Sequence, residues 1–364
     1  MSPLLHLCEP AAWRAALTTG QLRPPSEAGF VHLSHPDQVH QPAERLFPGR
    51  RDLVLLVVDP ARLADPVREE PAVLPGPLPT AAVVAVVPYR PPAEPVLPRP
   101  DDALGRALAL SLSLRTRRAA EVRDVPGGVA VLDPRFRHSR DDNRLVLWEP
   151  VDAATVAAAA TGTGLSHAAA TLTWPGADGV AAELAGRGWQ AEEVLVMARP
   201  ATPPLPGRRA EPVKQREVHA LWEAGWRADL AGEPDLDEVV AQLVGREHRN
   251  DTVVAVTDLA VREEGRVVAA GQLRVDGATA AVESVVTEPA ARGRGHGDAV
   301  LAAALDRAAA GGCDLVVLEA AAEDWPQHWY ARRGFATVGS TWEVTAPLAG
   351  VPHQAGGATH DSSR

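Results

Sequence analysis

Alternating glycines near the end of the chain are the clearest candidate for chemistry. The stretch contains Gly293, Gly295 and Gly297, interleaved with Arg292, Arg294 and His296 and followed by Asp298. A β-branched run precedes it and an Ala/Leu-rich run follows, which predicts a strand, a loop and a helix. Glycines let backbone N–H groups converge, and a helix start adds unpaired N–H groups and the positive end of a dipole. The stretch therefore predicts a pyrophosphate cradle, to which the two arginines add charge.

The spacing of these glycines separates the loop from two common phosphate-binding motifs. It is not the dinucleotide fingerprint Gly-x-Gly-x-x-Gly, because position 298 is Asp, and no Gly-Lys-Ser/Thr of a Walker A loop follows. The spacing Arg292-x-x-Gly295-x-Gly297 resembles the acyl-CoA loop of the GCN5-related N-acetyltransferase (GNAT) superfamily. Further on, Tyr330-Ala-Arg-Arg-Gly-Phe335 resembles the Tyr-x-x-x-Gly-Phe signature of that superfamily. The resemblance covers about residues 213–346.

The resemblance implies acetyl-CoA as co-substrate and an amine that attacks the thioester directly. Acetyl-CoA would lie between splayed strands at 280–287 and 314–320, and Tyr330 would protonate the leaving thiolate. The implied CoA contacts are Val285, Val286 and Thr287 for the pantetheine, and Arg292, Gly293, Arg294, Gly295, His296, Gly297 and Asp298 for the pyrophosphate. Asp298 departs from the pattern, since its charge would lie near a phosphate unless it serves only as a helix N-cap.

Glu283 is the candidate general base, because a neutral amine is needed for attack. Strand alternation places it on one face with Val285 and Thr287, although a solvated strand carboxylate is an equal alternative. Glu319 and Glu323 are competing candidates for the general base. Trp325, Trp329 and Trp342 either line the acceptor cleft or belong to the core, and His296 and His328 are expected at solvated positions. A non-catalytic acyl-CoA sensor or scaffold is the alternative function.

The elements that must position these residues follow an α-α-β-β-β-α-β-α-β order. The predicted helices are 213–229, 236–245, 298–310 and 326–332, and the predicted strands are 252–261, 266–275, 280–287, 315–320 and 336–344. The order indicates an α+β or mixed α/β layered fold. The resemblance implies a GNAT fold with splayed central strands.

Two proline-rich stretches, 88–100 and 200–212, are predicted to be extended linkers. They divide the chain into domains at 1–90, 101–199 and 213–346, with a disordered tail at 347–364. Segment 101–199 contains a predicted helix at 103–118 and strands near 128–132, 144–148 and 193–198. Its stretches 137–148 and 188–198 resemble the N-terminal half of tandem GNAT proteins, in a degenerate form without a glycine loop. Such a half would either form one side of the acceptor cleft of segment 213–346 or serve only as a packing partner.

The first segment resembles a small bacterial family, domain of unknown function 952, across about residues 4–88. That family is similar in fold to ADP-ribosyltransferase and RNA 2′-phosphotransferase domains. The likeness implies His6 and His32 on adjacent strands, with Glu69 or Glu70 as a carboxylate, and an NAD-dependent ADP-ribosyl- or phosphotransferase-like activity as a further alternative. The family's Pro-His-Leu-Tyr is replaced by Ala72-Val-Leu-Pro75, so structural histidines in a relic or binding domain are the competing interpretation.

The composition and charge of the chain limit the classes of partner that we expect it to bind. The chain has 364 residues, a formal charge of −11 and 46% hydrophobic residues, which suits packed domains and argues against a nucleic-acid backbone binder. Two cysteines, far apart, exclude a disulfide framework, and no metal site is predicted. The start shows no signal peptide and the apolar runs are too short to span a membrane. We expect a cytoplasmic protein that acts on a small-molecule or peptide amine, without a membrane or nucleic-acid partner.

Overall fold

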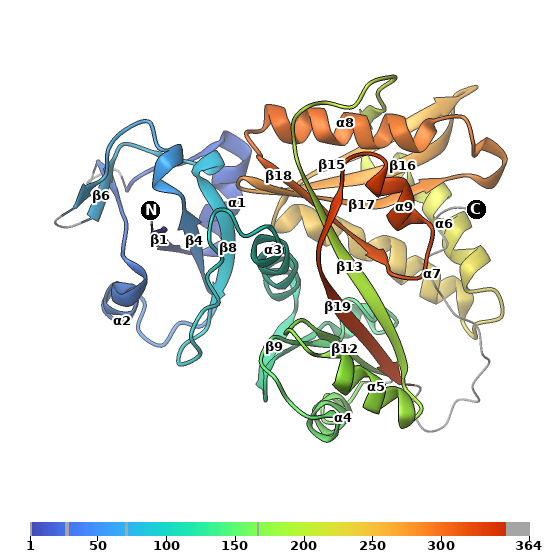
Figure 1. Ribbon diagram of the computed structural model, residues 1–364, viewed down its shortest axis with the longest axis horizontal. Helices are drawn as coiled ribbons and strands as arrows, with labels where there is room; N and C mark the ends of the chain where they lie inside the picture. The colour runs from blue at the N-terminus through green and yellow to red at the C-terminus, as the bar shows by residue number, and fades with distance from the viewer. Residues whose placement is uncertain (1, 26–28, 70–71, 166, 347–364) are drawn as a thin grey trace.

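A computed structural model describes residues 2–25, 29–69, 72–165 and 167–346 (Figure 1). The tail predicted at 347–364 lies outside the described residues. Within the described ranges the chain is a mixed α/β protein in which one large sheet carries most of the strands. None of the described helices combines the length and the apolar character that crossing a bilayer requires.

The first segment folds around a small antiparallel sheet of order β1-β4-β8. Every residue of its central strand, Leu53–Val58, is buried, as the continuous apolar run predicts. Two smaller sheets, β2-β7 and β3-β6-β5, accompany it. The elements are β1 (Leu4–Cys8), α1 (Pro10–Thr19), β2 (Gln21–Leu22), β3 (Phe30–His32), α2 (His40–Leu46), β4 (Leu53–Val58), β5 (Arg68–Glu69), β6 (Ala72–Pro75), β7 (Leu78–Pro79) and β8 (Val83–Tyr89).

The rest of the described chain forms one sheet of 11 strands, in the order β14-β15-β16-β17-β18-β13-β19-β12-β11-β10-β9. Its earlier elements are α3 (Ala103–Arg118), β9 (Glu121–Val125), β10 (Gly128–Leu132), β11 (Arg144–Leu147), α4 (Ala153–Thr161), β12 (Ala168–Leu172), α5 (Asp178–Gly186) and β13 (Gln190–Pro200). Its later elements are β14 (Glu211–Val213), α6 (His219–Asp229), α7 (Leu236–Gly245), β15 (Ala255–Glu263), β16 (Arg266–Asp276), β17 (Thr279–Thr287), α8 (His296–Ala310), β18 (Leu315–Ala321), α9 (Pro326–Ala331) and β19 (Ala336–Ala346).

The strands β13 and β19 join the two halves of this sheet. β13, from the second predicted segment, pairs with β18, while β19, from the third, pairs with β12. The two strands also pair with each other over most of their length. Because the halves exchange strands in this way, neither half can complete its own sheet without the other.

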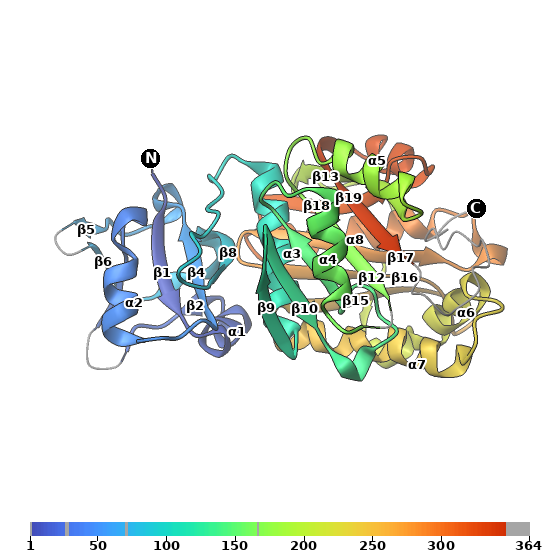
Figure 2. The same ribbon diagram turned by 90° about the horizontal axis from the view of Figure 1, so that it is seen from below.

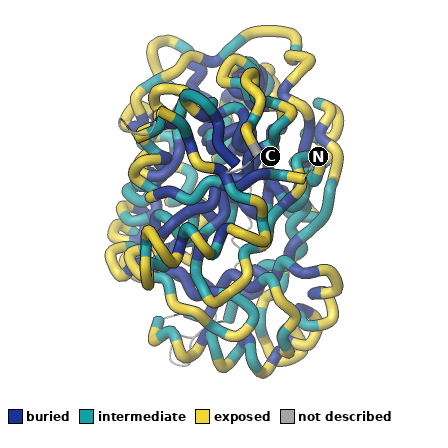
Figure 3. Tube along the Cα trace, turned by 90° about the vertical axis from the view of Figure 1, so that its left-hand side faces the viewer, coloured by how far each residue is buried: buried dark blue, intermediate teal, exposed yellow. Residues whose placement is uncertain are grey.

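Helices cover both faces of the sheet. α8 packs on one face with apolar residues of β15 to β18, and α3, α6 and α7 pack on the opposite face (Figure 1). The buried positions along the trace concentrate in the interior of the molecule, and the exposed positions lie mainly on its outside (Figure 3). Because successive side chains of a strand point to opposite faces of the sheet, each side chain of β17 and β18 lies either on the α8 face or on the α3 face.

The first segment is anchored to the turn between β16 and β17, beside α3 (Figure 2). Trp13 Nε1 donates to Asp276 Oδ1 at 2.6 Å, and Thr279 Oγ1 donates to Val84 O at 2.7 Å. Gly277 has φ +76°, and a Cβ added there would lie 2.3 Å from Val83 O. Only glycine fits this turn, since both the backbone conformation and the neighbouring carbonyl exclude a side chain.

Substituting Gly277 is therefore expected to destabilise the junction. Gly277→Ala combines left-handed strain with a steric clash, and we expect a loss of roughly 3 kcal/mol of unfolding free energy, measured by urea denaturation. Gly49→Ala is the control, because Gly49 has φ +73° but open space around the added Cβ. Equal losses in the two variants would contradict the close approach at Gly277.

Several predicted elements need correction. The predicted helix at 213–229 begins only at His219, because Glu211–Val213 forms the edge strand β14 and a 3-10 turn follows. The strand β12 and the helix α4 were not predicted. The second proline-rich stretch is not a free linker, since Pro200 ends β13 and the Ala210 N–H donates to Ala299 O of α8 at 3.0 Å.

Candidate active site

The central strands β17 and β18 separate after a short parallel contact. They pair only from Thr279–Ala281 to Leu315–Val317. Beyond that point β17 still pairs with β16 as far as Thr287, and β18 still pairs with β13 as far as Ala321. Each strand therefore keeps one backbone edge that no strand pairs with in the described chain. Such edges offer N–H and C=O groups to an extended ligand.

A β-bulge in β17 sets the direction of its side chains. Ser284 has φ +53°, and the register jumps so that Ser284 and Val285 lie opposite Gly271. The extra residue reverses the alternation. Val285 packs with the α8 core, whereas Val286 packs with the α6–α7 core.

The predicted common face of Glu283, Val285 and Thr287 is therefore wrong. Glu283 alternates with Ala281, which packs under α3, and a Cβ added at Gly297 of α8 would lie 4.0 Å from Thr287 Oγ1. Glu283 thus faces α3, whereas Val285 and Thr287 face α8. Alternation cannot anticipate this, because the bulge depends on Ser284 adopting a left-handed conformation beside Gly271.

The glycine loop leads directly from β17 into the 15-residue helix α8. Gly293 and Gly295 have φ +76° and +78°, and a Cβ added to either would meet nothing within 4 Å. The first backbone bond of the helix runs from Ala299 N–H to Gly295 O at 3.1 Å. The N–H groups of the preceding residues in the first turn therefore lack an intrahelical acceptor, and the space beside Gly293 and Gly295 is open.

Two side chains that were predicted to hold the pyrophosphate, those of Arg294 and His296, bind Glu263. Arg294 Nη1 donates to Glu263 Oε2 at 2.8 Å, and His296 Nε2 lies 2.9 Å from Glu263 Oε1. Burial acts to raise the pKa of Glu263, but the bonds from His296 and Arg294 outweigh it and leave the pKa below its usual range. His296 is buried, so the solvated position predicted for it is wrong, and only its backbone remains at the loop. Arg292 Nε donates to Thr287 O at 3.2 Å and so ties the loop to the end of β17.

The negative charge of Asp298 is compensated within the protein. Arg333 Nε donates to Asp298 Oδ1, and its guanidinium lies 4.0 Å from the Trp329 ring centroid. Trp329 reaches the start of α8, since a Cβ added at Gly297 would lie 3.2 Å from Trp329 Cζ2. The end of α9 and the start of α8 therefore form one surface, on which the predicted conflict between Asp298 and a phosphate is offset by Arg333.

Tyr330 lies half-buried between two aromatic rings. Its ring centroid is 4.8 Å from that of Trp329 and 5.8 Å from that of Phe335, both in edge-on geometry. Burial, followed by the charge of Glu283, raises the pKa of Tyr330, while Arg333 opposes the shift. The hydroxyl therefore keeps its proton at neutral pH and can act as a donor.

Two carboxylates occupy matching positions where β17 and β18 separate. Glu283 and Glu319 each lie two residues beyond the last paired residues, Ala281 and Val317, and so face the α3 side together. Among the described residues, neither carboxylate forms a hydrogen bond or an ion pair.

The surroundings of Glu319 make this carboxyl group less acidic than an ordinary glutamate. Although its side chain reaches solvent, desolvation by the surrounding protein raises the pKa of Glu319 to about 7, with Arg115 opposing and Glu283 adding to the shift. The remaining acidic candidate, Glu323, is exposed on the loop after β18. A carboxylate with a pKa near 7 is suited to exchange protons at neutral pH.

The other predicted candidates have mostly structural surroundings. Trp342 packs in the core with α5 and β12, and His328 is exposed on α9. Trp325 is partly buried, and its Nε1 has no hydrogen-bond partner among the described residues. Glu263, Arg333 and the bulge at Ser284 were not predicted as part of the site. Of these, only Arg333 carries a sequence signal, since it lies within the Tyr330–Phe335 motif.

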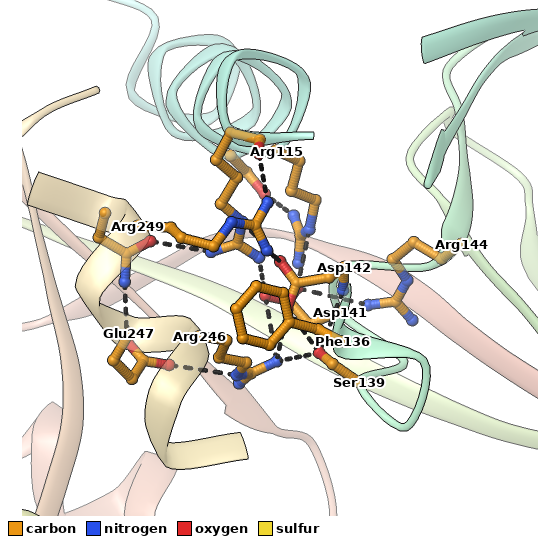
Figure 4. A network of polar contacts seen from close by, with 12 residues as sticks. Arg115, Phe136, Ser139, Asp141, Asp142, Arg144, Arg246, Glu247 and Arg249 are labelled. Atoms are coloured by element: carbon orange, nitrogen blue, oxygen red, sulfur yellow. Dashed lines mark hydrogen bonds and ion pairs between the residues drawn. The ribbon is translucent and has the colours of Figure 1, made fainter. Parts of the chain in front are cut away.

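The second segment contributes an ion-pair network beside this site (Figure 4). Asp142 Oδ1 lies 3.0 Å from both Arg118 Nε and Arg249 Nη1, and Arg115 Nε donates to Asp141 Oδ1 at 3.0 Å. Burial opposes ionisation of Asp141, but Arg118 and Arg115 hold its pKa well below the usual range. The motif at 137–148 thus joins α3 to the turn after α7, and it positions Arg115 close enough to influence Glu319.

The candidates of the first segment lie far from the glycine loop in sequence and form their own group. His6 Nδ1 lies 2.7 Å from His32 O, and burial lowers the pKa of His6. A bridge between Leu5 and Ser34 makes their strands neighbours, and His32 itself is exposed. The backbone of Glu69 belongs to β5, and Glu70 lies outside the described residues. No group of side chains suited to a metal ion occurs in the described ranges.

Two families of known proteins match separate parts of the chain. Residues 217–335 match the model of the acetyltransferase (GNAT) family, and residues 7–86 match that of a protein family of unknown function, DUF952. No curated protein matches the chain.

Several solved structures are weakly similar to this chain. A conserved protein of unknown function from Staphylococcus epidermidis is 10% identical with a TM-score of 0.49, over 64% of this chain and 95% of that one. A GCN5-related N-acetyltransferase from Kribbella flavida is 20% identical with a TM-score of 0.44, over 68% and 96%. A tandem GNAT protein from the clavulanic acid biosynthesis pathway is 14% identical with a TM-score of 0.39, over 55% and 69%.

The region that contains the glycine loop, the separated strands and Tyr330 therefore matches the GNAT acetyltransferase family, and the region that contains His32 matches the DUF952 family.

Proposed function

We propose that this protein transfers an acetyl or other small acyl group from acetyl-CoA to an amine by direct attack, without a covalent enzyme intermediate. The observation that carries the proposal is the unpaired edge of β17 beyond Ala281, which leads into the open glycine loop at the start of α8. An extended thioester ligand with a pyrophosphate at one end has the shape and the hydrogen-bonding groups that this path requires.

The residues present fit such a ligand. Pantetheine would bond to the backbone of Val285 to Thr287, and the pyrophosphate would accept N–H groups between Gly293 and Asp298. No Cβ blocks the loop at Gly293 or Gly295. Arg333 adds a cation near the same helix start.

The proposed chemistry needs one proton acceptor and one proton donor. The amine nitrogen attacks the thioester carbonyl carbon, the carbon–sulfur bond breaks, and the amine proton passes to the Glu283–Glu319 pair. Glu283 is the member of this pair whose charge reaches Tyr330. Tyr330, which stays protonated, gives its proton to the departing thiolate.

Binding and turnover test different parts of this proposal. Calorimetry of the full chain with acetyl-CoA should show saturable binding, and absence of binding at millimolar ligand would refute the site. Release of free CoA in the presence of a broad panel of amines should exceed its release without them. Binding without amine-dependent CoA release would favour a non-catalytic sensor or scaffold instead.

The carboxylate pair predicts a specific pH dependence. Because Glu319 must lose its proton before the pair can accept one, kcat/KM should rise with pH through about 7. Glu319→Gln should remove this inflection, and Glu283→Gln should move it to lower pH, because a negative neighbour no longer opposes ionisation of Glu319. Glu323→Gln, on the exposed loop, should leave the profile unchanged. An inflection that persists in Glu319→Gln would exclude Glu319 from the proton transfer.

A further inference from the structure

A second cavity opens beside the edge strand β14, separate from the glycine loop. Its volume is about 440 Å³, which is within the range of small-ligand pockets. Three short pieces of chain line it: Val213 to Arg216, His248 with Asp251, and Val256 to Asp258. None of these residues belongs to the acyl-CoA path described above.

Gln215 lines this cavity with an unsatisfied amide. The residue is only 7% exposed, yet neither Nε2 nor Oε1 has a hydrogen-bond partner among the described residues. Buried amides in folded proteins are nearly always hydrogen-bonded. A ligand in the cavity that offers both a donor and an acceptor would satisfy both atoms.

The wall formed by Asp258 and Asp251 is acidic. Asp258 is 6% exposed, and Oδ1 accepts a bond from Gln272 Nε2 at 2.9 Å. Burial, together with the charge of Asp251, raises the pKa of Asp258.

The nearby arginines do not neutralise this wall directly. Arg14 Nε donates to the backbone oxygen of Asp251, and Arg274 donates to Gln272 and Glu247. In the part of the chain that the structure describes, no side-chain cation forms a hydrogen bond or ion pair with either carboxylate. The wall is therefore suited to a ligand ammonium group.

Two basic residues also line the cavity. Lys214 and Arg216 flank Gln215 and are exposed, and neither forms an ion pair with Asp251 or Asp258. Val213 and Val256 add apolar surface. The lining of the cavity therefore combines two carboxylates, two cations and a buried amide that needs hydrogen-bond partners.

We propose that this cavity binds a small zwitterion of the amino-acid class, with its ammonium against Asp258 and Asp251 and its carboxylate toward Lys214 and Arg216. The side chain of the ligand packs on Val213 and Val256, and Gln215 bonds to its polar groups. The site is independent of the proposed acyl transfer, because the two share no residue.

Three matched probes test the charge requirement by calorimetry on the full chain. L-leucine carries both charges, 3-methylbutylamine lacks the carboxylate, and 4-methylpentanoate lacks the ammonium. We expect saturable binding of L-leucine and binding at least about tenfold weaker for each of the other two. Equal affinity for a single-charge probe, or no binding of L-leucine at millimolar concentration, would overturn the proposal.

Variants assign the two walls separately. Asp258→Asn should weaken L-leucine binding at least about tenfold, while Asp65→Asn, at an exposed loop position, should leave it unchanged. The double variant Lys214→Gln, Arg216→Gln changes only exposed residues, so it should fold normally, lose L-leucine affinity and keep its weak affinity for 3-methylbutylamine. Unchanged L-leucine binding in the double variant or in Asp258→Asn would overturn the assignment. Gly295→Glu should keep L-leucine binding, which separates this site from the acyl-CoA site.

Discussion

Gly295→Glu is expected to abolish acetyl-CoA binding while the protein stays folded. Gly295 precedes the first residue of α8 in a left-handed conformation, with open space where a Cβ would project. A glutamate there places a side chain and a negative charge where the pyrophosphate would lie, and it weakens the positive end of the helix dipole. We expect affinity to fall at least about 100-fold in calorimetry.

The matched control for this variant is Gly188→Glu. Gly188 also has a positive φ, of +88°, with nothing within 4 Å of an added Cβ, and it lies in the turn between α5 and β13. The control introduces the same strain, roughly 1–2 kcal/mol, and the same charge away from the loop. Comparable acetyl-CoA affinity in Gly295→Glu and the parent protein would show that the loop does not hold the pyrophosphate.

Tyr330→Phe is expected to slow turnover about 100-fold, the scale of a lost general acid, with acetyl-CoA affinity changed less than about threefold. The substitution removes only the hydroxyl and retains the ring that packs between Trp329 and Phe335. The thiolate would then leave without a proton donor. Steady-state kinetics should therefore show the loss in kcat rather than in KM for acetyl-CoA.

Tyr89→Phe provides the comparison, because Tyr89 is the other tyrosine in the chain. Its hydroxyl lies 2.9 Å from His40 Nδ1 in the first segment, so the variant should retain full turnover. A parental rate in Tyr330→Phe would remove Tyr330 from the mechanism, and a large rise in KM would point to a binding role instead.

Local signals were sufficient for most of the helices and strands around the site. The helix predicted at 103–118 is confirmed with those bounds, and the apolar run at 53–58 forms a strand, because apolar patterning and a capping residue such as Asp102 act within a few residues. The helix start at His219 was missed because β14 is an edge strand of only three residues, whose pairing partner β15 lies more than 40 residues later. Such pairing leaves no local pattern.

The position of Glu283 on the α3 face of the sheet shows why strand alternation alone could not predict which side chains share the site. Period-2 counting holds only in a regular strand, and one extra residue at Ser284 reverses every later position. The partners Glu263 and Arg333 were also beyond sequence reasoning in their roles. Glu263 reaches His296 across 33 positions, and nothing in its own neighbourhood marks it.

The glycine loop is legible from the residues alone: glycines at 293, 295 and 297 follow a predicted strand and precede a predicted helix, and a Tyr-x-x-x-Gly-Phe motif lies downstream. These are short-range properties, because backbone freedom and the start of a helix depend on neighbouring residues. Which side chains meet at the loop depends on long-range contacts. The separation of β17 from β18, the matching of Glu283 with Glu319 and the pairing of Asp298 with Arg333 all depend on strand register and on helices packed from distant parts of the chain.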